Sequence, residues 1–169
     1  LCDGLPLAYH MELGFLTSCL SNIGTGLRVS VMLHLPGLVL SGQMERVLRA
    51  IRAYGLTVRG YLGEGTEAHG NLHQVANEST LGEEETEILD GLRRAVQKVI
   101  EQERNARMVL VESDRTRILD HVGRAYGILG RAHLLGSREA LAHLSALRLG
   151  VALGIFQRLD GATINELWT

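Results

Sequence analysis

The sequence predicts an α+β fold with strands in its first half and helices in its second. Before about residue 80, short runs with β-type alternation are separated by glycine-containing turns and interrupted by one helix. After residue 80 the spacing of apolar residues is helical to the last residue. With 169 residues, 46% of them hydrophobic, the chain can bury the core of one domain, or of one domain and part of a second.

Four stretches of the first half are predicted strands. Residues 14–19 form a short one, and residues 28–35 form a clearer one, because their alternation separates two chemistries. Two more strands are predicted at residues 56–61 and 72–76. In residues 28–35, one face carries Val29, Val31, Leu33 and Leu35, whereas the other carries Arg28, Ser30, Met32 and His34. The first face is therefore expected to pack on helices, and the second to face a pocket or solvent.

The predicted helices follow from apolar spacing. Residues 38–54 form one helix, which Gly55 is placed to end, and residues 83–112 form a long amphipathic helix with an acidic first turn. Two further helices follow, one around residues 118–129 and one that Ser137 is expected to cap.

Composition excludes several classes of protein. The 20 glycines occur with only two prolines, which is not the composition of a flexible linker. A net charge of −2 gives no general case for nucleic acid or membrane binding, and neither an apolar run long enough to span a membrane nor a leader is seen, so we expect a cytoplasmic chain. Cys2 and Cys19 form neither a disulfide framework nor a metal motif. Sixteen of the 17 cationic side chains are arginines, which fits either a bias in composition or the binding of phosphate groups.

Residues 19–30 form the first stretch suited to chemistry. A thiol, Cys19, is followed by a turn of small residues that includes Gly24 and Gly26, and then by Arg28 at the start of the next strand. Uncovered backbone amides beside an arginine are typical of an anion cradle. The same residues also fit an ordinary turn, with Cys19 as a small buried hydrophobe.

Residues 59–68 form the second such stretch. A strand that contains Arg59 runs into a glycine-rich loop that carries Glu64 and Glu67. Phosphoryl transfer needs arginines on the phosphate oxygens and a carboxylate that orients the nucleophile, and a mobile loop could supply that carboxylate. The alternative is an acidic, solvated loop. The seven histidines show no spacing typical of metal ligands, so no metal-ligating residues are predicted.

These two stretches resemble the catalytic domain of the ATP:guanidino phosphotransferases, or phosphagen kinases. The first match is Leu16-Thr17-Ser18-Cys19 with Ser21-Asn22-x-Gly24-Thr25 and Leu27-Arg28-x-Ser30-Val31; the second is Arg59-Gly60-x-x-Gly63-Glu64-x-Thr66-Glu67-Ala68. Within the family, the bacterial protein-arginine kinase branch is more similar than the creatine or free-arginine kinases. The helical tail beyond residue 113 distinguishes this branch most clearly, together with runs such as Tyr126-Gly127-Ile128-Leu129 and Ser137-Arg138-Glu139-Ala140.

The resemblance implies an antiparallel sheet flanked by helices, which is part of the catalytic domain (residues 1–112), followed by a helical C-terminal region (residues 113–169). It implies transfer of the γ-phosphoryl group of ATP, with Mg²⁺, to the guanidinium of arginine residues in proteins. Cys19 and Glu64 or Glu67 match the catalytic residues, with Glu64 slightly favoured. The nucleotide-binding residues implied are Arg28, Val29, Ser30, Val31, Met32, Arg59, Gly60, Tyr61, Leu62, Gly63 and Glu64.

Some positions depart from the family pattern. Leu20 replaces a usual proline, Val29 replaces a usual alanine, and Leu62 stands where the kinases of small guanidines carry a further arginine. We expect both ends to be cut, without the N-terminal domain that supplies a second catalytic carboxylate and without a C-terminal arginine-rich motif. The chain alone is therefore expected to have little or no activity.

The resemblance also implies partners: ATP, protein substrates that carry arginine, a second copy in a homodimer, and proteins of the bacterial stress response, with no nucleic acid and no membrane. Two alternatives stay open. One is a non-catalytic module that binds nucleotide or acts as an adaptor, and the other is a kinase for a free guanidino metabolite.

Overall fold

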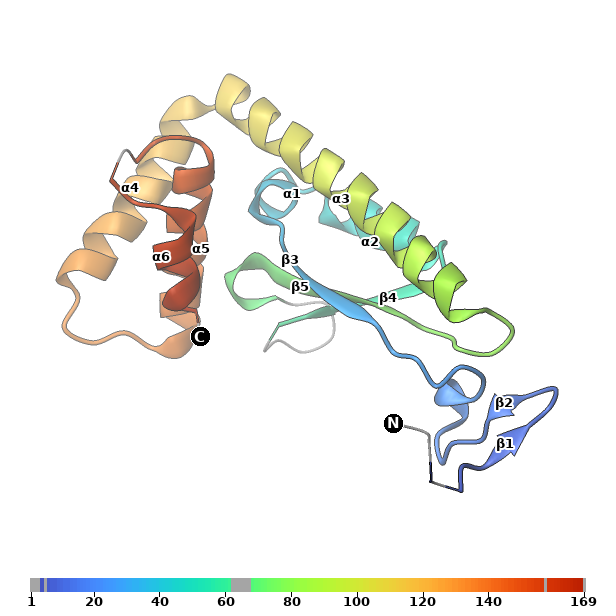
Figure 1. Ribbon diagram of the computed structural model, residues 1–169. Helices are drawn as coiled ribbons and strands as arrows, with labels where there is room; N and C mark the ends of the chain where they lie inside the picture. The colour runs from blue at the N-terminus through green and yellow to red at the C-terminus, as the bar shows by residue number, and fades with distance from the viewer. Residues whose placement is uncertain (1–3, 5, 62–67, 157, 169) are drawn as a thin grey trace.

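The computed structural model describes residues 4, 6–61, 68–156 and 158–168 (Figure 1). It confirms the α+β class: an antiparallel sheet is flanked by helices and followed by a helical C-terminal region. None of the helices in the described residues is both long and apolar enough to cross a membrane.

The central sheet has three antiparallel strands in the order β3 (Ser30–His34), β5 (Leu72–Asn77) and β4 (Leu56–Gly60). Its register brings Val31 and Val58 opposite Val75 on one face. Met32 and Arg59 lie opposite Gln74 on the other face, because neighbouring residues of a strand point to opposite sides. The alternation predicted for residues 28–35 is thus confirmed.

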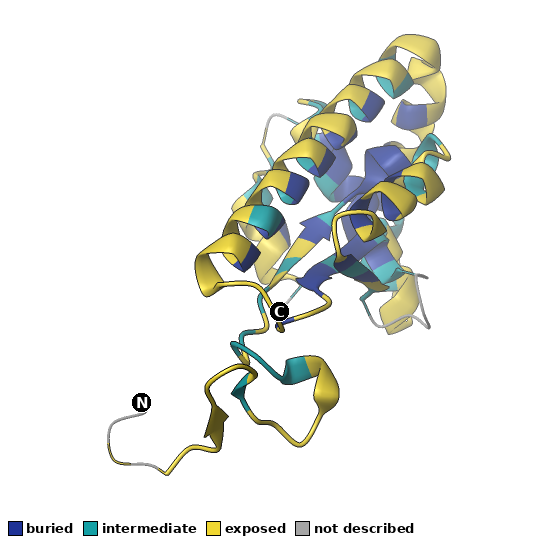
Figure 2. Cartoon of the chain, turned by 90° about the vertical axis from the view of Figure 1, so that its right-hand side faces the viewer, coloured by how far each residue is buried: buried dark blue, intermediate teal, exposed yellow. Residues whose placement is uncertain are grey.

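Helices cover one face of this sheet, which we call the core face. They are α1 (Pro36–Leu40), α2 (Met44–Arg52) and α3 (Glu85–Ser113), and α3 presents its buried residues to the sheet (Figures 1 and 2). The core between them includes Leu33, Leu35, Leu38, Val47, Leu48, Ile51, Val58, Val75, Leu92 and Val99. On the other face, which we call the open face, the described residues form no such layer over Ser30, Met32 and Arg59.

The single helix predicted over residues 38–54 is wrong, because the structure has α1 and α2 with a break between them. Gly42 takes a φ of +70° in that break, a conformation that an L side chain rarely adopts. The apolar spacing used for the prediction lies almost wholly within α2, where Val47, Leu48 and Ile51 are buried. Gly55 takes a φ of +69° just beyond α2, as its predicted role at the helix end requires.

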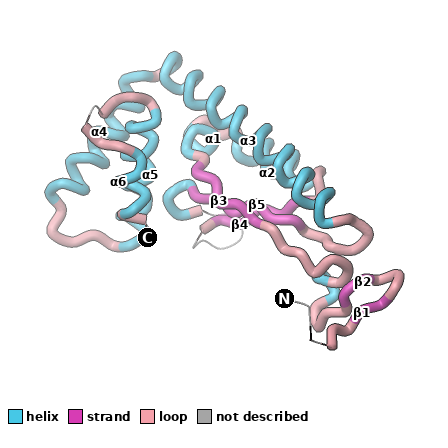
Figure 3. Tube along the Cα trace, in the orientation of Figure 1, coloured by secondary structure: helices cyan, strands magenta, loops and turns pink. Residues whose placement is uncertain are grey.

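The described residues before β3 are mostly loop, with a small hairpin of β1 (Tyr9–His10) and β2 (Gly14–Phe15) and a 3₁₀ turn, η1 (Leu20–Asn22) (Figure 3). The strand predicted over residues 14–19 therefore covers only two residues. After Phe15 has paired with Tyr9 and bridged to Gly24, the chain turns away into η1 and finds no further strand to pair with.

The C-terminal region contains α4 (Arg115–Arg131), α5 (Ser137–Ala152) and α6 (Gly161–Glu166). Leu144, Leu147 and Ile164 are the buried centre of a second apolar cluster there. The N-cap of α5 is Gly136, so the predicted cap at Ser137 is wrong by one residue. Besides α4 and α6, α5 contacts η2 (His69–Asn71), which immediately precedes β5 (Figure 1).

A buried carboxylate joins α3 to the start of α1. Glu103 is 4% exposed, and its two carboxylate oxygens accept hydrogen bonds from the amides of Gly37 (2.8 Å) and Leu38 (2.9 Å). Arg107, one turn further along α3, donates to the same carboxylate at 2.5 Å. All the acceptor positions that face the protein are thus used, and the charge is paired.

We predict that Glu103→Gln lowers the free energy of unfolding by about 2–4 kcal/mol, because an amide cannot accept both backbone bonds and pair with Arg107. Denaturant unfolding measures the effect. Glu101→Gln, at an exposed position on the same helix, is the control and should change it by less than about 0.5 kcal/mol. Equal effects of the two variants would contradict this role of Glu103.

His73 provides a second prediction, on pH. It lies on the core face of β5, is 2% exposed, and neither ring nitrogen has a partner; burial lowers its pKa to about 4. In the unfolded chain its pKa returns to about 6.5, so the unfolded state binds more protons as the pH falls, and stability is lost between about pH 6.5 and pH 4. We expect His73→Leu to keep the stability at pH 7 and to reduce that loss by up to about 3 kcal/mol.

Thermal melts across this pH range measure the effect. His133→Gln, at an exposed position, is the control and should leave the pH profile unchanged. An unchanged profile in His73→Leu would show that His73 does not cause the loss.

Candidate active site on the open face of the sheet

The open face of the sheet presents three rows of side chains across its strands. The register places Ser30 beside Ala76 and Thr57, and Met32 beside Gln74 and Arg59. The third row holds His34 and Leu72, followed by Tyr61, whose amide donates to the Leu72 carbonyl at 2.9 Å. The rows contain no carboxylate, so the face offers cationic and neutral polar groups to a ligand.

The predicted nucleotide-binding residues divide between the two faces. Arg28, Ser30, Met32, Arg59 and Tyr61 belong to the open face by alternation, and Arg28, Ser30 and Arg59 are exposed. The side chains of Val29 and Val31 instead pack against the core, and Gly60 has no side chain. These last three residues can offer a ligand only their backbone.

Arg28 and Arg59 form no ion pair with another described residue. Within the described residues, the ion pairs are Arg93–Asp90, Arg107–Glu103, Arg124–Asp120 and His143–Glu139, and neither Arg28 nor Arg59 takes part in one. Two exposed guanidinium groups on one face can each bind phosphate oxygens through two N–H donors.

Cys19 is exposed and lies directly before η1. Its Sγ is 3.0 Å from the Ser21 hydroxyl oxygen. Hydrogen bonds from the Ser21 hydroxyl and backbone lower the pKa of the thiol, and the charge of Arg28 lowers it further by a smaller amount. Cys19 is therefore an accessible thiol with a raised thiolate fraction, rather than a buried hydrophobe.

The turn at residues 24–26 is not the open anion cradle that its composition suggested. The amide of Gly24 donates to the Phe15 carbonyl, that of Thr25 to the Thr80 carbonyl, and that of Leu27 to the Thr25 hydroxyl. Gly24 is needed because a Cβ there would lie 2.1 Å from the Thr80 carbonyl oxygen. The turn therefore fixes Arg28 and Cys19 in place but leaves these three amides no capacity for an anion.

Asn77 and Thr80, which also belong to the runs that resemble the family, hold this segment onto the sheet, a role that sequence reasoning did not assign to them. The side chain of Asn77, 5% exposed, accepts from the Val29 amide at 2.8 Å and donates to the Leu27 carbonyl at 2.9 Å. Thr80 donates its hydroxyl proton to the Ile23 carbonyl at 2.7 Å. Their partners lie 50 and 57 residues away in the sequence, so no local pattern could assign these contacts.

Gln74 is a third residue that sequence reasoning missed. It lies between Met32 and Arg59 on the open face and donates to the Ser30 hydroxyl at 2.8 Å. Its polarity within the apolar run of residues 72–76 was visible, but its neighbours depend on the strand register. The predicted residues Leu62, Gly63, Glu64 and Glu67 lie outside the described residues.

The C-terminal helices cover the third row of the open face. His34 Nε2 is 2.8 Å from the Ser145 hydroxyl oxygen, and its ring packs edge-on against Trp168 at 5.1 Å between centroids. A cavity of about 370 Å³ at this end is lined by Met32, His34, Tyr61, Leu72, Arg148, Asn165 and Trp168. Burial, with the charges of Arg148 and Arg107, lowers the pKa of His34 to about 3, so His34 is neutral at pH 7.

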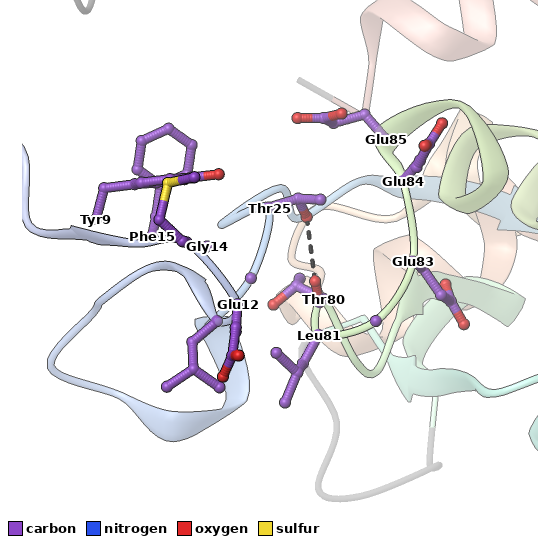
Figure 4. Close-up of a pocket in the computed structure, with 14 residues that line it drawn as sticks. Tyr9, Glu12, Gly14, Phe15, Thr25, Thr80, Leu81, Glu83, Glu84 and Glu85 are labelled. Atoms are coloured by element: carbon purple, nitrogen blue, oxygen red, sulfur yellow. Dashed lines mark hydrogen bonds between the residues drawn. The ribbon is translucent and has the colours of Figure 1, made fainter.

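A larger cavity, of about 540 Å³, lies between the β1–β2 hairpin and the start of α3 (Figure 4). Its wall includes four carboxylates, Glu12, Glu83, Glu84 and Glu85, and none of the predicted site residues. The negative charge makes it unsuited to a nucleotide's phosphates. No group of three or more His, Cys, Asp or Glu side chains that could hold a metal ion occurs among the described residues.

Comparisons with known proteins agree with this geometry. Residues 1–106 match the family described as ATP:guanido phosphotransferase, C-terminal catalytic domain. The chain belongs to that family. Residues 115–169 match a second description, the protein-arginine kinase McsB C-terminal domain.

Curated relatives are similar along nearly the whole chain. The protein-arginine kinase of Halalkalibacterium halodurans is 49% identical over 160 residues, which is 95% of this chain and 45% of the relative. That of Moorella thermoacetica is 48% identical over 163 residues, or 96% and 47% of the two chains. The chain thus spans about half the length of the curated relatives it matches.

A solved structure is also similar. The crystal structure of lombricine kinase is 34% identical, with a TM-score of 0.50, over 57% of this chain and 26% of that one. The likeness agrees with the guanidino-kinase fold of the catalytic part.

The environment of Cys19 yields a prediction about its reactivity. In a Cys2→Ser background, Ser21→Ala should raise the pKa of the Cys19 thiol and slow its alkylation by iodoacetamide near pH 7 several-fold, because the thiolate is the reacting form. The pH dependence of the alkylation rate measures the pKa. Ser18→Ala, which leaves the Ser21 hydroxyl in place, is the control, and equal rates in the two variants would contradict the assignment.

Proposed function

We propose that the naturally encoded protein containing this chain is a protein-arginine kinase, which transfers the γ-phosphoryl group of ATP to the guanidinium of arginine residues in proteins. The observation that carries the proposal is the pair of exposed arginines, Arg28 and Arg59, on the open face without carboxylate partners among the described residues. The similarity to protein-arginine kinases over 95% or more of this chain supports the choice of substrate.

In this proposal, Arg28 and Arg59 bind the phosphate oxygens and offset the charge that spreads over them during transfer. Ser30, Met32, Gln74 and Tyr61 complete the surface on which the nucleotide lies. Mg²⁺ would be held together with the nucleotide's phosphates, because the described rows of the open face offer it no carboxylate. When bound, the metal neutralises phosphate charge.

The acceptor lies beside Cys19. A guanidinium nitrogen of the substrate attacks the γ-phosphorus, the bond from that phosphorus to the bridging oxygen of ADP breaks, and the nitrogen loses a proton. We assign that proton to Glu64 or Glu67 of the adjoining loop, with Glu64 slightly favoured, because a carboxylate can both orient a guanidinium and accept its proton. Arginine and ATP thus give phosphoarginine, ADP and a proton.

The remaining parts of the proposal concern the whole protein. The complete activity is assigned to the naturally encoded protein, because the chain spans about half the length of its relatives and one phosphate-binding arginine can change the rate by about 10³–10⁵. The two family matches, which end at residue 106 and begin at residue 115, support a division into residues 1–112 and 113–169. We also propose a cytoplasmic location, a homodimer and stress-response partner proteins.

The test is a phosphorylation assay on the naturally encoded protein with an arginine-containing protein substrate, read as acid-labile phosphoarginine. We expect Arg28→Ala to lower kcat/KM for ATP by about 10²–10³, because a charged phosphate contact is lost from the transition state. Cys19→Ala and Glu64→Ala should also lower activity. Arg49→Ala is the matched control, since Arg49 is exposed on α2, on the helix-covered side of the sheet.

Two outcomes would overturn the proposal. Unchanged activity in the Arg28, Cys19 and Glu64 variants would exclude this site, and nucleotide binding without any phosphoarginine would favour a non-catalytic adaptor. Competition by free arginine tests for a kinase of a small guanidino metabolite. If the protein is such a kinase, free arginine should inhibit phosphorylation of the protein substrate at concentrations near the KM for free arginine.

A further inference from the structure

Two consecutive residues at the start of β5 adopt the left-handed conformation. Gly70 has a φ of +64° and Asn71 a φ of +56°, and Asn71 is the one non-glycine residue with a positive φ in the described part of the chain. Such a conformation costs an L residue free energy and persists only where neighbouring groups hold it. The neighbours of Asn71 therefore show what this backbone is fixed against.

α5 supplies those neighbours. The Asn71 side-chain amide donates to the Ser145 hydroxyl oxygen at 2.8 Å, and Ser145 is 0% exposed. A Cβ at Gly70 would lie 2.9 Å from the Leu141 carbonyl oxygen, so α5 approaches the backbone as closely as a glycine allows. Leu141 and Ser145 are one turn apart on one side of α5, which is thus pressed against residues 70 and 71 (Figure 1).

The same hydroxyl also reaches β3. Ser145 Oγ is 2.8 Å from His34 Nε2, and the Leu35 amide donates to the Asn71 carbonyl at 2.9 Å. Because His34 is neutral, its Nε2 can accept the Ser145 hydroxyl proton while the Ser145 oxygen accepts from Asn71. The Ser145 hydroxyl thus joins Asn71, which donates to it, to His34, whose Nε2 accepts from it in one of the two neutral tautomers.

Residues 69–72 are in turn bound to the end of β4. The Tyr61 amide donates to the Leu72 carbonyl at 2.9 Å, and the His69 amide donates to the Tyr61 carbonyl at 3.1 Å. Tyr61 follows Arg59 by two residues and shares its face of the sheet. A shift at residues 70 and 71 is therefore transmitted through two backbone hydrogen bonds to the strand end that carries Arg59.

We propose that Ser145 is a positioning residue for the candidate site: its hydroxyl, bonded to Asn71 and His34, holds the end of β4 in register with the end of β3. The C-terminal helical region thereby fixes Arg59 and Tyr61 relative to Ser30 and Met32. The effect on phosphoryl transfer rests on the proposed function, whereas the effect on the backbone does not. Ser145 touches no substrate and acts only through Asn71 and His34.

The test compares variants of the naturally encoded protein by hydrogen exchange and by steady-state kinetics. Ser145→Ala should speed exchange of the Tyr61 and His69 amides about tenfold or more and lower kcat about tenfold, since small misplacements of catalytic groups slow a reaction strongly. Asn71→Gly removes the same hydrogen bond from the other side while keeping a positive φ favourable, so it should act similarly. Asn71→Gly also tests the proposal by itself if the Ser145→Ala variant does not fold.

Two comparisons separate positioning from a loss of stability. Leu144→Ala alters the neighbouring buried residue of α5, which packs in the C-terminal apolar cluster, and it should lower the melting temperature. At temperatures well below melting, it should leave kcat and the exchange rates of Tyr61 and His69 within about twofold of the wild-type values. Ser145→Ala in the Asn71→Gly background should lower kcat by less than it does in the wild type, because the bond from Asn71 is already lost and only the bond between Ser145 and His34 remains to be broken.

Unchanged exchange at Tyr61 and His69 in both Ser145→Ala and Asn71→Gly would overturn the inference, as would faster exchange with an unchanged kcat. A wild-type protein without kinase activity would instead overturn the proposed function. In that case exchange alone decides: faster exchange confined to Tyr61 and residues 69–72 supports the inference, and exchange like that of the wild type overturns it.

Discussion

The buried carboxylate of Glu103 fixes α3 over the sheet, and the division of the molecule into two faces depends on it. Its bonds to the amides of Gly37 and Leu38 occupy donors at the start of α1, which follows β3 directly. Arg107 pairs with this carboxylate and also donates to the His34 carbonyl at the end of β3, at 3.4 Å. Gly37 permits the approach, because a Cβ there would lie 2.9 Å from a Glu103 carboxylate oxygen. One ion pair thus sets both the position of α3 and the direction in which the chain leaves β3.

Once α3 covers one face, strand alternation directs each side chain of residues 28–35 either to the core face or to the open face. Val31 and Leu33 bury their side chains under the helices, and Ser30 and Met32 are directed to the other side. A ligand on the open face therefore competes with no core contact. The same alternation places Arg28 and Arg59, which have no carboxylate partner in the described part of the chain, on the exposed side of the sheet, where they avoid the cost of burying an uncompensated charge.

The elements were largely predictable, because each depends on a local pattern: alternation for β3, apolar spacing for α3, and a glycine after α2. The break at Gly42 was not, since the apolar spacing lies within α2 and gives no start for the helix, and only the left-handed backbone reveals the break. Contacts between distant residues were least accessible. The bond from Asn71 to Ser145 joins positions 74 residues apart, and the place of Gln74 between Met32 and Arg59 depends on a register that no local pattern fixes. Cys19 and Arg28 could be singled out as candidates because they belong to a contiguous motif.

The C-terminal helices determine how much of the open face a ligand can use. Leu72 belongs to this face by alternation but is only 8% exposed, because α5 and α6 lie over the row that it shares with His34. The rows of Met32 and of Ser30 are left accessible, and both lie toward the end of the sheet where Arg28 precedes β3. An anion held by Arg28 and Arg59 would lie between the helical region on one side and the segment that carries Cys19 and Arg28 on the other. The helical region limits the site as well as supporting it, so a change in how α5 packs would alter the size of the accessible surface and the placement of Arg59 together.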